Sequence, residues 1–309
     1  MSNRRRPDRP IHGWLVIDKP KGTTSARVVA RVRRLTGATK AGHGGTLDPL
    51  ASGVLPIALG EATKTVAYVM DGTKAYRFTV RWGEARDTDD ADGEVTAESP
   101  VRPGEAEIRA ELARFLGEIE QIPPTYSAVK VEGQRAYALA RANESFALAP
   151  RVVRIDLIEL VCMDDDDHAT FEVECGKGTY MRALARDLGQ SLGAFAHIVA
   201  LRRTAVGPFT EGQAISLDSV GALGHSAGAF EHLLPIETAL VDIPALALTE
   251  TEARWLRSGR PVPMLRASDV ERIDGLHPGT SVCAMSSGKP VAVARFDKGK
   301  LRPVRVFNL

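Results

Sequence analysis

The segment 169–193 places the strongest constraint on the fold of this chain. Residues 169–180 (ATFEVECGKGTY) alternate as a strand, with Phe171, Val173 and Cys175 on one face. The chain then passes through two glycines into residues 181–193, where apolar side chains recur at helical spacing. They are Met181, Leu184, Ala185, Leu188 and Leu192. A half-buried strand that leads into an amphipathic helix indicates a fold that mixes α and β structure.

Other segments carry both periodicities. Residues 13–20 (GWLVIDKP) predict a short buried strand stopped by proline, and residues 75–83 predict a strand with Tyr76, Phe78 and Val80 on one face. Residues 24–37 predict a helix that Ser25 caps and Gly37 ends. No repeat of 20 to 50 residues is visible, so the pattern favours an α+β fold over a repeat architecture.

A domain boundary is expected near residues 240–245. Beyond it, short β-like runs are broken by Gly and Pro, which suits a small β-barrel-like module. We therefore expect a basic N-terminal tail over residues 1–10, a large α+β domain over residues 11–244 and a small β domain over residues 245–309.

The net charge of +1 hides an uneven distribution of charge along the chain. Residues 1–43 carry 11 Lys and Arg against 2 Asp and Glu, residues 84–120 carry 4 against 12, and residues 245–309 carry 11 against 6. Two basic ends around an acidic middle suggest that one face holds a polyanion. A solvated tail with ordinary surface charge would give the same pattern, so charge alone leaves both readings open.

The sequence points to a cytosolic protein. No apolar run approaches the roughly 20 residues that cross a bilayer, and the start, MSNRRRPDRPIHGW, has no apolar signal-peptide core. Cys162, Cys175 and Cys283 are odd in number, far apart and form no CxxC pair. We expect buried free thiols, with neither a disulfide framework nor a zinc site.

Scans for common catalytic motifs exclude several classes of enzyme. There is no GxxxxGK[ST] loop and no GxGxxG after a strand, so nucleotide hydrolysis and dinucleotide binding have no support. GxSxG occurs around Ser191 and Ser226, with Asp242 and His277 following in hydrolase order, but neither serine has a buried strand directly before it. The run DDDDH (164–168) is typical of a solvated turn rather than of a metal cluster.

Asp48 is surrounded in the sequence by glycine and small apolar residues, in the stretch GHGGTLDPLASGVLPIALGEATK (42–64). Gly44 and Gly45 allow an unusual turn or a close approach, and Pro49 restricts Asp48 to extended conformations. An aspartate is already an anion at neutral pH, so it could attack a sugar carbon or an electrophilic ring carbon without a base to activate it. The alternative is that Asp48 only tightens the turn.

This stretch resembles the nucleophile motif of the bacterial tRNA pseudouridine-55 synthases, the TruB family. Five further segments are similar to the same family in the same order, so the resemblance covers nearly the whole chain. They are LVIDKPKGTTS (15–25), YRFTVRWGEARDTDDADGE (76–94), PPTYSAVKVEGQRAYALAR (123–141), GKGTYMRALARDLG (176–189) and LRRTAVGPF (201–209).

The resemblance implies an α+β pseudouridine-synthase fold, with a mixed, mostly antiparallel central sheet flanked by helices and a small C-terminal PUA-like β-barrel. It implies isomerisation of uridine to pseudouridine at position 55 in the T-loop of tRNA, through base flipping and an aspartate nucleophile, by a cytoplasmic monomer. No metal, organic cofactor, membrane or obligatory protein partner is implied. The RNA partner would be the T-stem and T-loop, with the C-terminal module on the stem.

Site residues follow from the resemblance position by position. Asp48 would be the nucleophile, Tyr76 would lie against the base as a candidate for proton transfer, and Arg182 would pair with Asp48. The substrate pocket would be completed by Lys19, His43, Lys64, Tyr180 and Leu201. Whether Asp48 attacks the ribose C1′ or the base C6 stays open.

Each role has a plainer alternative. Tyr76 could be a core aromatic, Arg182 a surface charge paired with Asp187 or Glu174, and His43 a simple loop residue. For the whole chain, the alternatives are a non-catalytic tRNA-folding or RNA-binding protein on the same scaffold, and a serine esterase built around Ser226.

Overall fold

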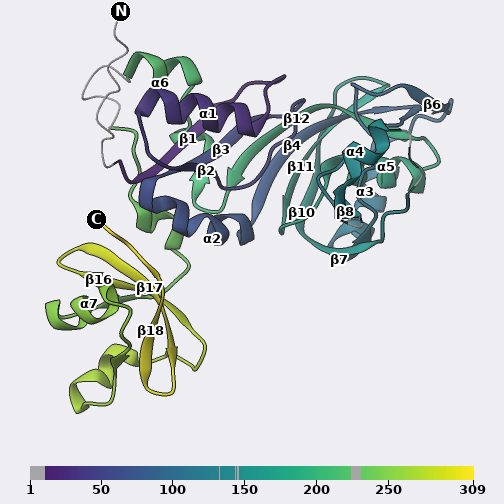
Figure 1. Ribbon diagram of the computed structural model, residues 1–309. Helices are drawn as coiled ribbons and strands as arrows, with labels where there is room; N and C mark the ends of the chain where they lie inside the picture. The colour runs from purple at the N-terminus through teal and green to yellow at the C-terminus, as the bar shows by residue number, and fades with distance from the viewer. Residues whose placement is uncertain (1–10, 132, 143, 145, 224–230) are drawn as a thin grey trace, which may run out of the picture.

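Two sheets organise the chain in the computed structural model, which describes residues 11–309 except 132, 143, 145 and 224–230 (Figure 1). Nine strands of the described residues form the larger sheet, in the order β1-β3-β12-β4-β11-β10-β7, with β2 on β3 and β13 on β12. The strands are β1 (Gly13–Lys19), β2 (Ala41–His43), β3 (Ser52–Leu59), β4 (Lys74–Trp82), β7 (Gly117–Gln121), β10 (Arg151–Met163), β11 (His168–Cys175), β12 (Ala196–Val206) and β13 (Phe209–Thr210).

Antiparallel pairing dominates this sheet. Strands β3 and β12 pair in parallel, whereas β1 with β3, β12 with β4, β4 with β11, and β11 with β10 are antiparallel. The expected mixed, mostly antiparallel α+β fold is therefore confirmed. Two small ribbons stand apart from the sheet: β5 (Glu84–Arg86) with β6 (Val95–Glu98), and β8 (Lys130–Val131) with β9 (Gln134–Arg135).

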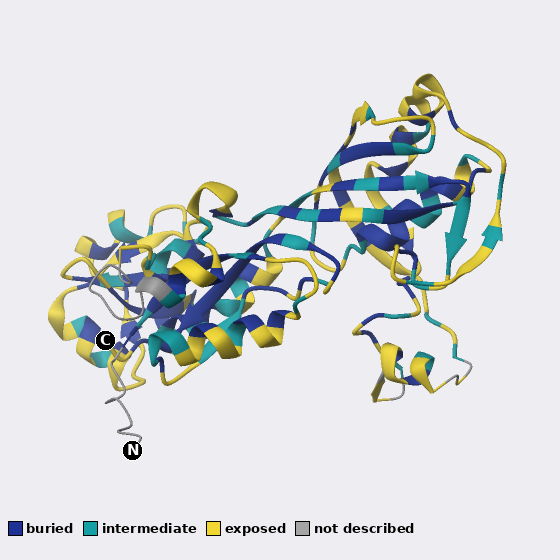
Figure 2. Cartoon of the chain, turned by 90° about the horizontal axis from the view of Figure 1, so that it is seen from above, coloured by how far each residue is buried: buried dark blue, intermediate teal, exposed yellow. Residues whose placement is uncertain are grey.

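Helices flank the larger sheet and its connections. They are α1 (Ser25–Thr36), α2 (Val66–Asp71), α3 (Glu105–Leu112), α4 (Ala136–Arg141), α5 (Met181–Ser191) and α6 (Leu217–Leu223), with short 3₁₀ turns η1 (Gly60–Thr65), η2 (Ala113–Phe115), η3 (Glu211–Gln213) and η5 (Ile236–Leu240). Figure 2 shows buried residues running along the strands and exposed residues on the outer faces of the helices.

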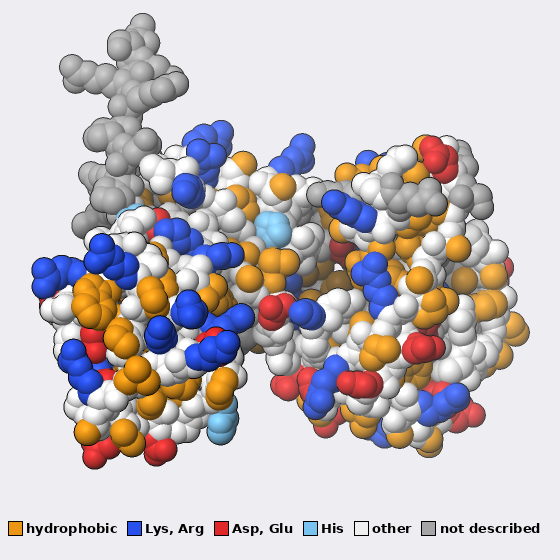
Figure 3. All heavy atoms as spheres, turned by 60° about the horizontal axis from the view of Figure 1, so that its bottom comes forward, with side chains coloured by type: hydrophobic (Ala, Val, Ile, Leu, Met, Phe, Trp, Pro, Cys, Tyr) orange, Lys and Arg blue, Asp and Glu red, His pale blue; other side chains and the backbone are white. Residues whose placement is uncertain are grey.

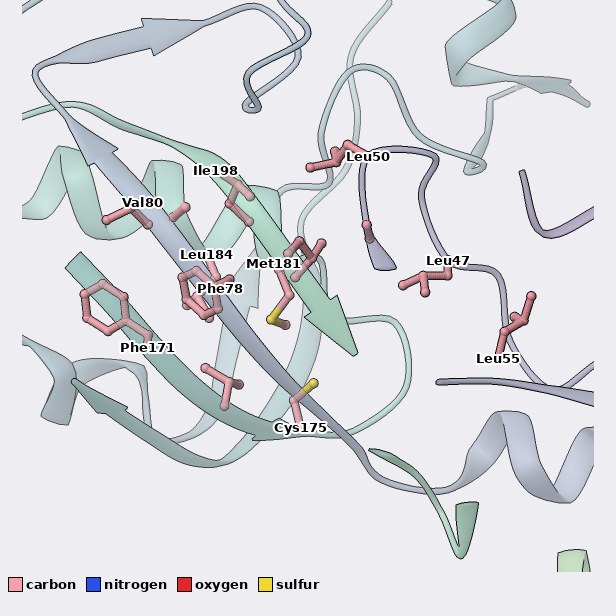
Figure 4. Close-up of a cluster of buried hydrophobic side chains, with 14 of the residues drawn as sticks. Leu47, Leu50, Leu55, Phe78, Val80, Phe171, Cys175, Met181, Leu184 and Ile198 are labelled. Atoms are coloured by element: carbon pink, nitrogen blue, oxygen red, sulfur yellow. The ribbon is translucent and has the colours of Figure 1, made fainter. Parts of the chain in front are cut away.

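The main core lies on the face of the sheet that α1, α3 and α5 cover. Phe78 of β4 and Phe171 of β11 stack with ring centroids 5.4 Å apart, and Leu184 of α5 belongs to the same cluster (Figure 4). The opposite face of these strands is polar, with Thr79 hydrogen-bonded to Thr170. This is the pattern of an antiparallel sheet with one wet face, and it confirms the predicted facing of Phe78 and Val80.

The first helix corrects one detail of the sequence prediction. Thr24, not Ser25, is the N-cap of α1, and its Oγ1 accepts a hydrogen bond from the N–H of Arg27. The Ser25 hydroxyl is used elsewhere: it donates to the carbonyl of Leu47 and accepts from the N–H of Leu47. Gly37 ends the helix with φ = 70°, as predicted.

A curled five-stranded sheet forms the C-terminal part, in the order β14-β16-β17-β18-β15. Its elements are β14 (Ala245–Ala247), α7 (Glu250–Arg257), β15 (Val262–Pro263), η6 (Ala267–Asp269), η7 (Glu271–Ile273), β16 (Ser281–Ser286), β17 (Lys289–Asp297) and β18 (Lys300–Val306). The sheet is consistent with the expected PUA-like module. It does not stand alone, because Cys283, Val293 and Phe307 share a buried cluster with Trp14 and Phe209 of the larger domain.

The prediction for the cysteines has a structural outcome. Cys162 is exposed, so the prediction of three buried thiols is wrong for it, whereas Cys175 and Cys283 are buried. Cys162 lies near the end of β10, where the strand leads into the acidic turn 164–167. Among the described residues, no cluster of His, Cys, Asp and Glu suits a metal ion. In that same part of the chain, no helix is long and apolar enough to span a membrane.

Candidate active site

Asp48 opens onto a cavity of about 550 Å³ between the β2–β3 loop, the start of β4 and the start of α5. Its side chain is 34% exposed. Of the residues expected at the site, Tyr76, Tyr180 and Leu201 line the same cavity. Its volume is in the range of small-molecule sites, so it can admit one nucleotide.

Arg182 is the direct partner of Asp48. Its Nε and Nη2 both lie 3.0 Å from Asp48 Oδ2, and its side chain is only 6% exposed. The pairing excludes the alternative of a surface charge, since Asp187 pairs with Arg186 instead. The buried guanidinium thus holds the Asp48 carboxylate in place at the cavity.

Arg182 is fixed by three further groups. Its Nη1 donates to the carbonyl of Thr88 and its Nη2 to the carbonyl of Tyr126, both at 2.9 Å. Asp90, which is 5% exposed, lies 3.5 Å from Arg182 Nε. Burial raises the pKa of Asp90, while hydrogen bonding from Thr88 and the charge of Arg182 oppose that shift. Arg182 is thus held between two carboxylates, and Asp48 is the more exposed of them.

Lys19 lies behind the Asp48 loop, fully buried at the end of β1. Its Nζ donates to the carbonyls of Thr23 (2.8 Å), Pro20 (3.1 Å) and Pro49 (3.4 Å). Burial lowers the pKa of Lys19 to about 8, against the opposing pull of the Asp48 charge. Lys19 therefore fastens the chain directly after Asp48 rather than pairing with the carboxylate.

Aromatic and apolar residues form the walls of the cavity. Tyr76 of β4 and Leu201 of β12 lie on neighbouring antiparallel strands. Burial raises the pKa of Tyr76, so its phenol is neutral at pH 7. Tyr180, just before α5, is held by Gln121, whose amide accepts from the Tyr180 N–H (2.8 Å) and donates to the Tyr180 carbonyl (3.1 Å).

His43 and Arg203 hold the glycines that precede Asp48. The Gly45 N–H donates to His43 Nδ1 (3.3 Å), which places the proton of a neutral ring on Nε2, and burial lowers the pKa of His43. Arg203, 1% exposed, donates to the carbonyls of Gly45 (3.1 Å), Thr46 (3.2 Å) and Val54 (2.8 Å). His43 is not among the cavity-lining residues, whereas Arg203 is.

The glycines are needed here for steric reasons. Gly45 has φ = 128°, a conformation that side chains rarely adopt, and a Cβ on Gly44 would lie 2.6 Å from Val69 Cγ1. The hydrogen bonds of His43 and Arg203, together with those of Ser25 and Lys19, hold the loop that carries Asp48 in one conformation. Asp48 is presented from a rigid support.

Lys64 is the expected site residue that the structure places elsewhere. It lies on η1, donates to Glu61 Oε2 and to the carbonyl of Val306 in β18 (both 2.6 Å), and is not among the residues that line the cavity. The N–H of Asn308 also donates to Glu61 (2.8 Å). Lys64 and Glu61 therefore join the larger domain to the last strand of the smaller one.

Sequence reasoning assigned no role to Arg203, Gln121 or Asp90. A signal existed for Arg203, because it lies two residues after Leu201 and strand alternation puts both on one face. Lys74 lies two residues before Tyr76 on β4, so it shares the face of Tyr76, and it also lines the cavity. Gln121 and Asp90 act through buried contacts with distant segments, which no local pattern reveals.

The two serines of the GxSxG pattern gain no support. Ser191 is the last residue of α5, and its hydroxyl donates to the Leu188 carbonyl (2.9 Å). It does not follow a strand, so it is not a nucleophile elbow. Ser226 lies outside the described residues.

Comparisons with known proteins place the chain in a family. Residues 33–181 match the model of the TruB family pseudouridylate synthase N-terminal domain, and residues 182–241 match that of the tRNA pseudouridylate synthase B C-terminal domain. Among similar relatives are the tRNA pseudouridine synthase B of Rhodospirillum rubrum (58% identical, covering 99% of this chain and all of that one) and that of Bradyrhizobium diazoefficiens (55% identical, covering 99% and 88%).

Solved structures give the same fold. The archaeal box H/ACA sRNP Nop10–Cbf5 complex aligns with a TM-score of 0.71 at 27% identity, covering 96% of this chain and 86% of that one. An H/ACA RNP bound to a substrate RNA containing 2′-deoxyuridine aligns with a TM-score of 0.73 at 25% identity, covering 98% and 91%. The fold and the site define a pseudouridine synthase, an isomerase. More narrowly, the chain belongs to the TruB family.

Proposed function

We propose that this enzyme isomerises uridine to pseudouridine at position 55, in the T-loop of tRNA, with Asp48 as the nucleophile. The observation that carries the proposal is the Asp48–Arg182 pair, which opens onto a nucleotide-sized cavity beside Tyr76. The names of the relatives support tRNA as the substrate.

The chemistry requires a carboxylate nucleophile and a uracil ring that is sheltered from water. Asp48 Oδ attacks either the ribose C1′, displacing N1 of the uracil, or C6 of the ring; the contacts around Asp48 serve both routes. By either route the N1–C1′ bond breaks, the base turns, C5 bonds to C1′ and the bond to Asp48 breaks. C5 gives up its proton to water and N1 takes up a proton, so the isomerisation neither gains nor loses a proton. The high pKa of Tyr76 keeps its phenol protonated, so it can donate or relay a proton but is not a ready base.

Access to the uridine requires base flipping. A nucleotide stacked in an RNA loop hides its glycosidic bond, and extruding it costs a few kcal/mol. Tyr76 and Leu201 offer apolar surface that replaces the lost stacking. The rigid Asp48 loop needs no rearrangement when the nucleotide arrives, which lowers the cost of reaching the transition state.

Phosphate contacts offset the cost of flipping. Figure 3 shows one face of the molecule, on which Lys and Arg side chains gather over the C-terminal sheet. Residues 245–309 hold 11 of them against 6 acidic residues. We assign this sheet to the T-stem and the cavity to the T-loop, with binding that weakens as salt rises. In this proposal the enzyme works in the cytoplasm as a monomer without a protein partner.

The test is incubation of the purified chain with an unmodified tRNA transcript, followed by mapping of the altered uridine. Release of tritium from C5-labelled uridine measures turnover. Conversion at position 55 by the chain alone supports the proposal. Binding of the transcript without tritium release would overturn it, as would conversion at another uridine only.

A further inference from the structure

The mouth of the cavity carries cations that the proposed chemistry does not use. Arg151, at the start of β10, and Lys177, in the turn between β11 and α5, both line the cavity and are exposed. Lys74 adds a third positive charge from the wall, with its Nζ donating to the carbonyls of Met70 and Gly72. When an extruded nucleotide fills the cavity, its two flanking phosphates must stay outside, at this mouth.

Lys177 is already paired in the free enzyme. Its Nζ lies 2.8 Å from Oδ1 of Asp71, although the two residues are 106 positions apart and their side chains are 69% and 62% exposed. Asp71 also lines the cavity. An exposed ion pair of this kind contributes little to stability and is easily exchanged for another partner.

The position of Asp71 is unfavourable on two grounds. It is the last residue of α2, where the helix end already carries partial negative charge. It also puts a carboxylate at the mouth of a site that receives a polyanion, where like charges repel. A residue that is locally costly at a binding site is more readily explained by a functional role than by stability.

We propose that Lys177, with Arg151 on the lining of the same cavity, binds a phosphodiester group that flanks the extruded nucleotide, and that Asp71 occupies Lys177 until RNA arrives. The phosphate replaces the Asp71 carboxylate on the Lys177 ammonium. Gly176 and Gly178 flank the lysine, and a Cβ on Gly178 (φ = 86°) would meet nothing, so the turn leaves room for the backbone of an RNA strand. This inference rests on the proposed function, since it assumes an RNA nucleotide in the cavity.

The test measures the affinity of the full chain for a synthetic tRNA stem-loop that carries the target uridine, in the Asp48→Asn background so that the RNA stays unconverted. Asp71→Asn should tighten binding about 2- to 5-fold, and Lys177→Met should weaken it by a similar factor and reduce the salt dependence by about one counterion. In the Lys177→Met background Asp71→Asn should tighten binding less than it does when Lys177 is present, because it then removes only repulsion and no longer releases Lys177.

Glu172→Gln is the matched control, since Glu172 pairs with Arg77 on the solvent face of the sheet and does not line the cavity. If Asp71→Asn and Glu172→Gln bind the stem-loop equally, the proposal fails. It also fails if Asp71→Asn tightens binding by the same factor with and without Lys177, which would mean that Asp71 acts by repulsion alone.

A neutral methylphosphonate linkage on either side of the target uridine locates the contact. On one of the two modified stem-loops, the penalty of Lys177→Met should vanish. A penalty that persists on both would overturn the assignment. These outcomes differ from a failure of the proposed function, in which the unaltered chain would convert no uridine of the native stem-loop.

Discussion

Arg182 and Asp48 are 134 positions apart in the chain, yet the Arg182 guanidinium lies 3.0 Å from Asp48 Oδ2. The fold brings them together because Asp48 lies in the loop before β3, Arg182 lies at the start of α5, and α5 packs on β12, the strand beside β3. The pair places a positive charge directly beside the carboxylate in the cavity that we propose for the uracil base.

Asp48→Asn should lower the single-turnover rate of isomerisation by about 1000-fold or more, because an amide is a poor nucleophile. Binding of tRNA should change by less than about 3-fold, since the shape of the side chain is kept. Single-turnover tritium release and filter binding measure the two quantities, with Asp156→Asn as an exposed control. Substantial turnover by Asp48→Asn would refute the nucleophile assignment.

Arg182→Met should lower the single-turnover rate on the order of 100-fold, because the charge that stabilises the Asp48 anion is lost. Asp90→Asn should lower it by about 10-fold, since Asp90 only steadies the guanidinium. In the double variant the two losses should not add, because Asp90 acts through Arg182. Fully additive losses would show that Asp90 has a separate role.

Because of Lys19, raising the pH above 8 should lower the rate of the reaction but raise the free energy of unfolding. Burial lowers the pKa of Lys19 in the folded protein to about 8, from its ordinary value of 10.5. Above pH 8 the ammonium that holds the Pro49 carbonyl is lost, so the single-turnover rate should fall. Between pH 8 and 10.5 the unfolded chain binds more protons at this residue than the folded one, so Lys19 makes stability rise with pH.

Two variants check the Lys19 assignment. Lys19→Arg, which stays charged, should move the falling limb of the rate profile to higher pH on the same RNA. Lys19→Met should remove the alkaline gain in unfolding free energy measured with urea. A rate profile for Lys19→Arg that coincides with wild type would assign the limb to another group.

Arg203→Met should destabilise the fold by about 3 kcal/mol, because three buried carbonyls of the loop and of β3 lose their donor. Urea denaturation measures the loss, and Arg77→Met, which removes an exposed arginine from β4, should cost less than about 1 kcal/mol. Equal midpoints for the two variants would contradict the role of Arg203 as the support of the Asp48 loop.

Lys64→Met distinguishes a structural from an RNA-binding role for Lys64. Loss of its bonds to Glu61 and to the Val306 carbonyl should lower stability by about 1 kcal/mol. Glu61→Gln should have a similar effect, since it weakens the same joint. If Lys64→Met weakens tRNA binding but leaves the unfolding midpoint unchanged, then Lys64 acts on RNA as the family resemblance implies.

Local patterns in the sequence were enough to predict the strands and helices near the site. Period-2 alternation located β4 and β11, and the 3.6 period located α5, because each buries one face against a single core. Asp48 could be singled out because the glycines before it allow an unusual turn and Pro49 restricts its backbone.

The contacts that organise the site were beyond such patterns. Ser25 was expected to cap its own helix, but a buried loop 22 residues away competes for its hydroxyl. Arg203 and Lys19 each donate to several backbone carbonyls, and any segment can offer those regardless of its side chains. The place of Lys64 depends on how β18 packs on η1, which is a long-range contact with no signature in residues 42–64.

The buried cluster that Cys283 and Phe307 share with Trp14 gives the enzyme a fixed internal geometry. An appendage on a flexible tether would search for RNA independently of the catalytic cavity. Here the sheet that contains β16, β17 and β18 packs against β1 through this cluster. The distance between its basic surface and the Asp48 oxygens is therefore constant. If the sheet binds a helical arm of RNA and the cavity binds its loop, as proposed, this fixed separation selects RNAs whose arm has the matching length.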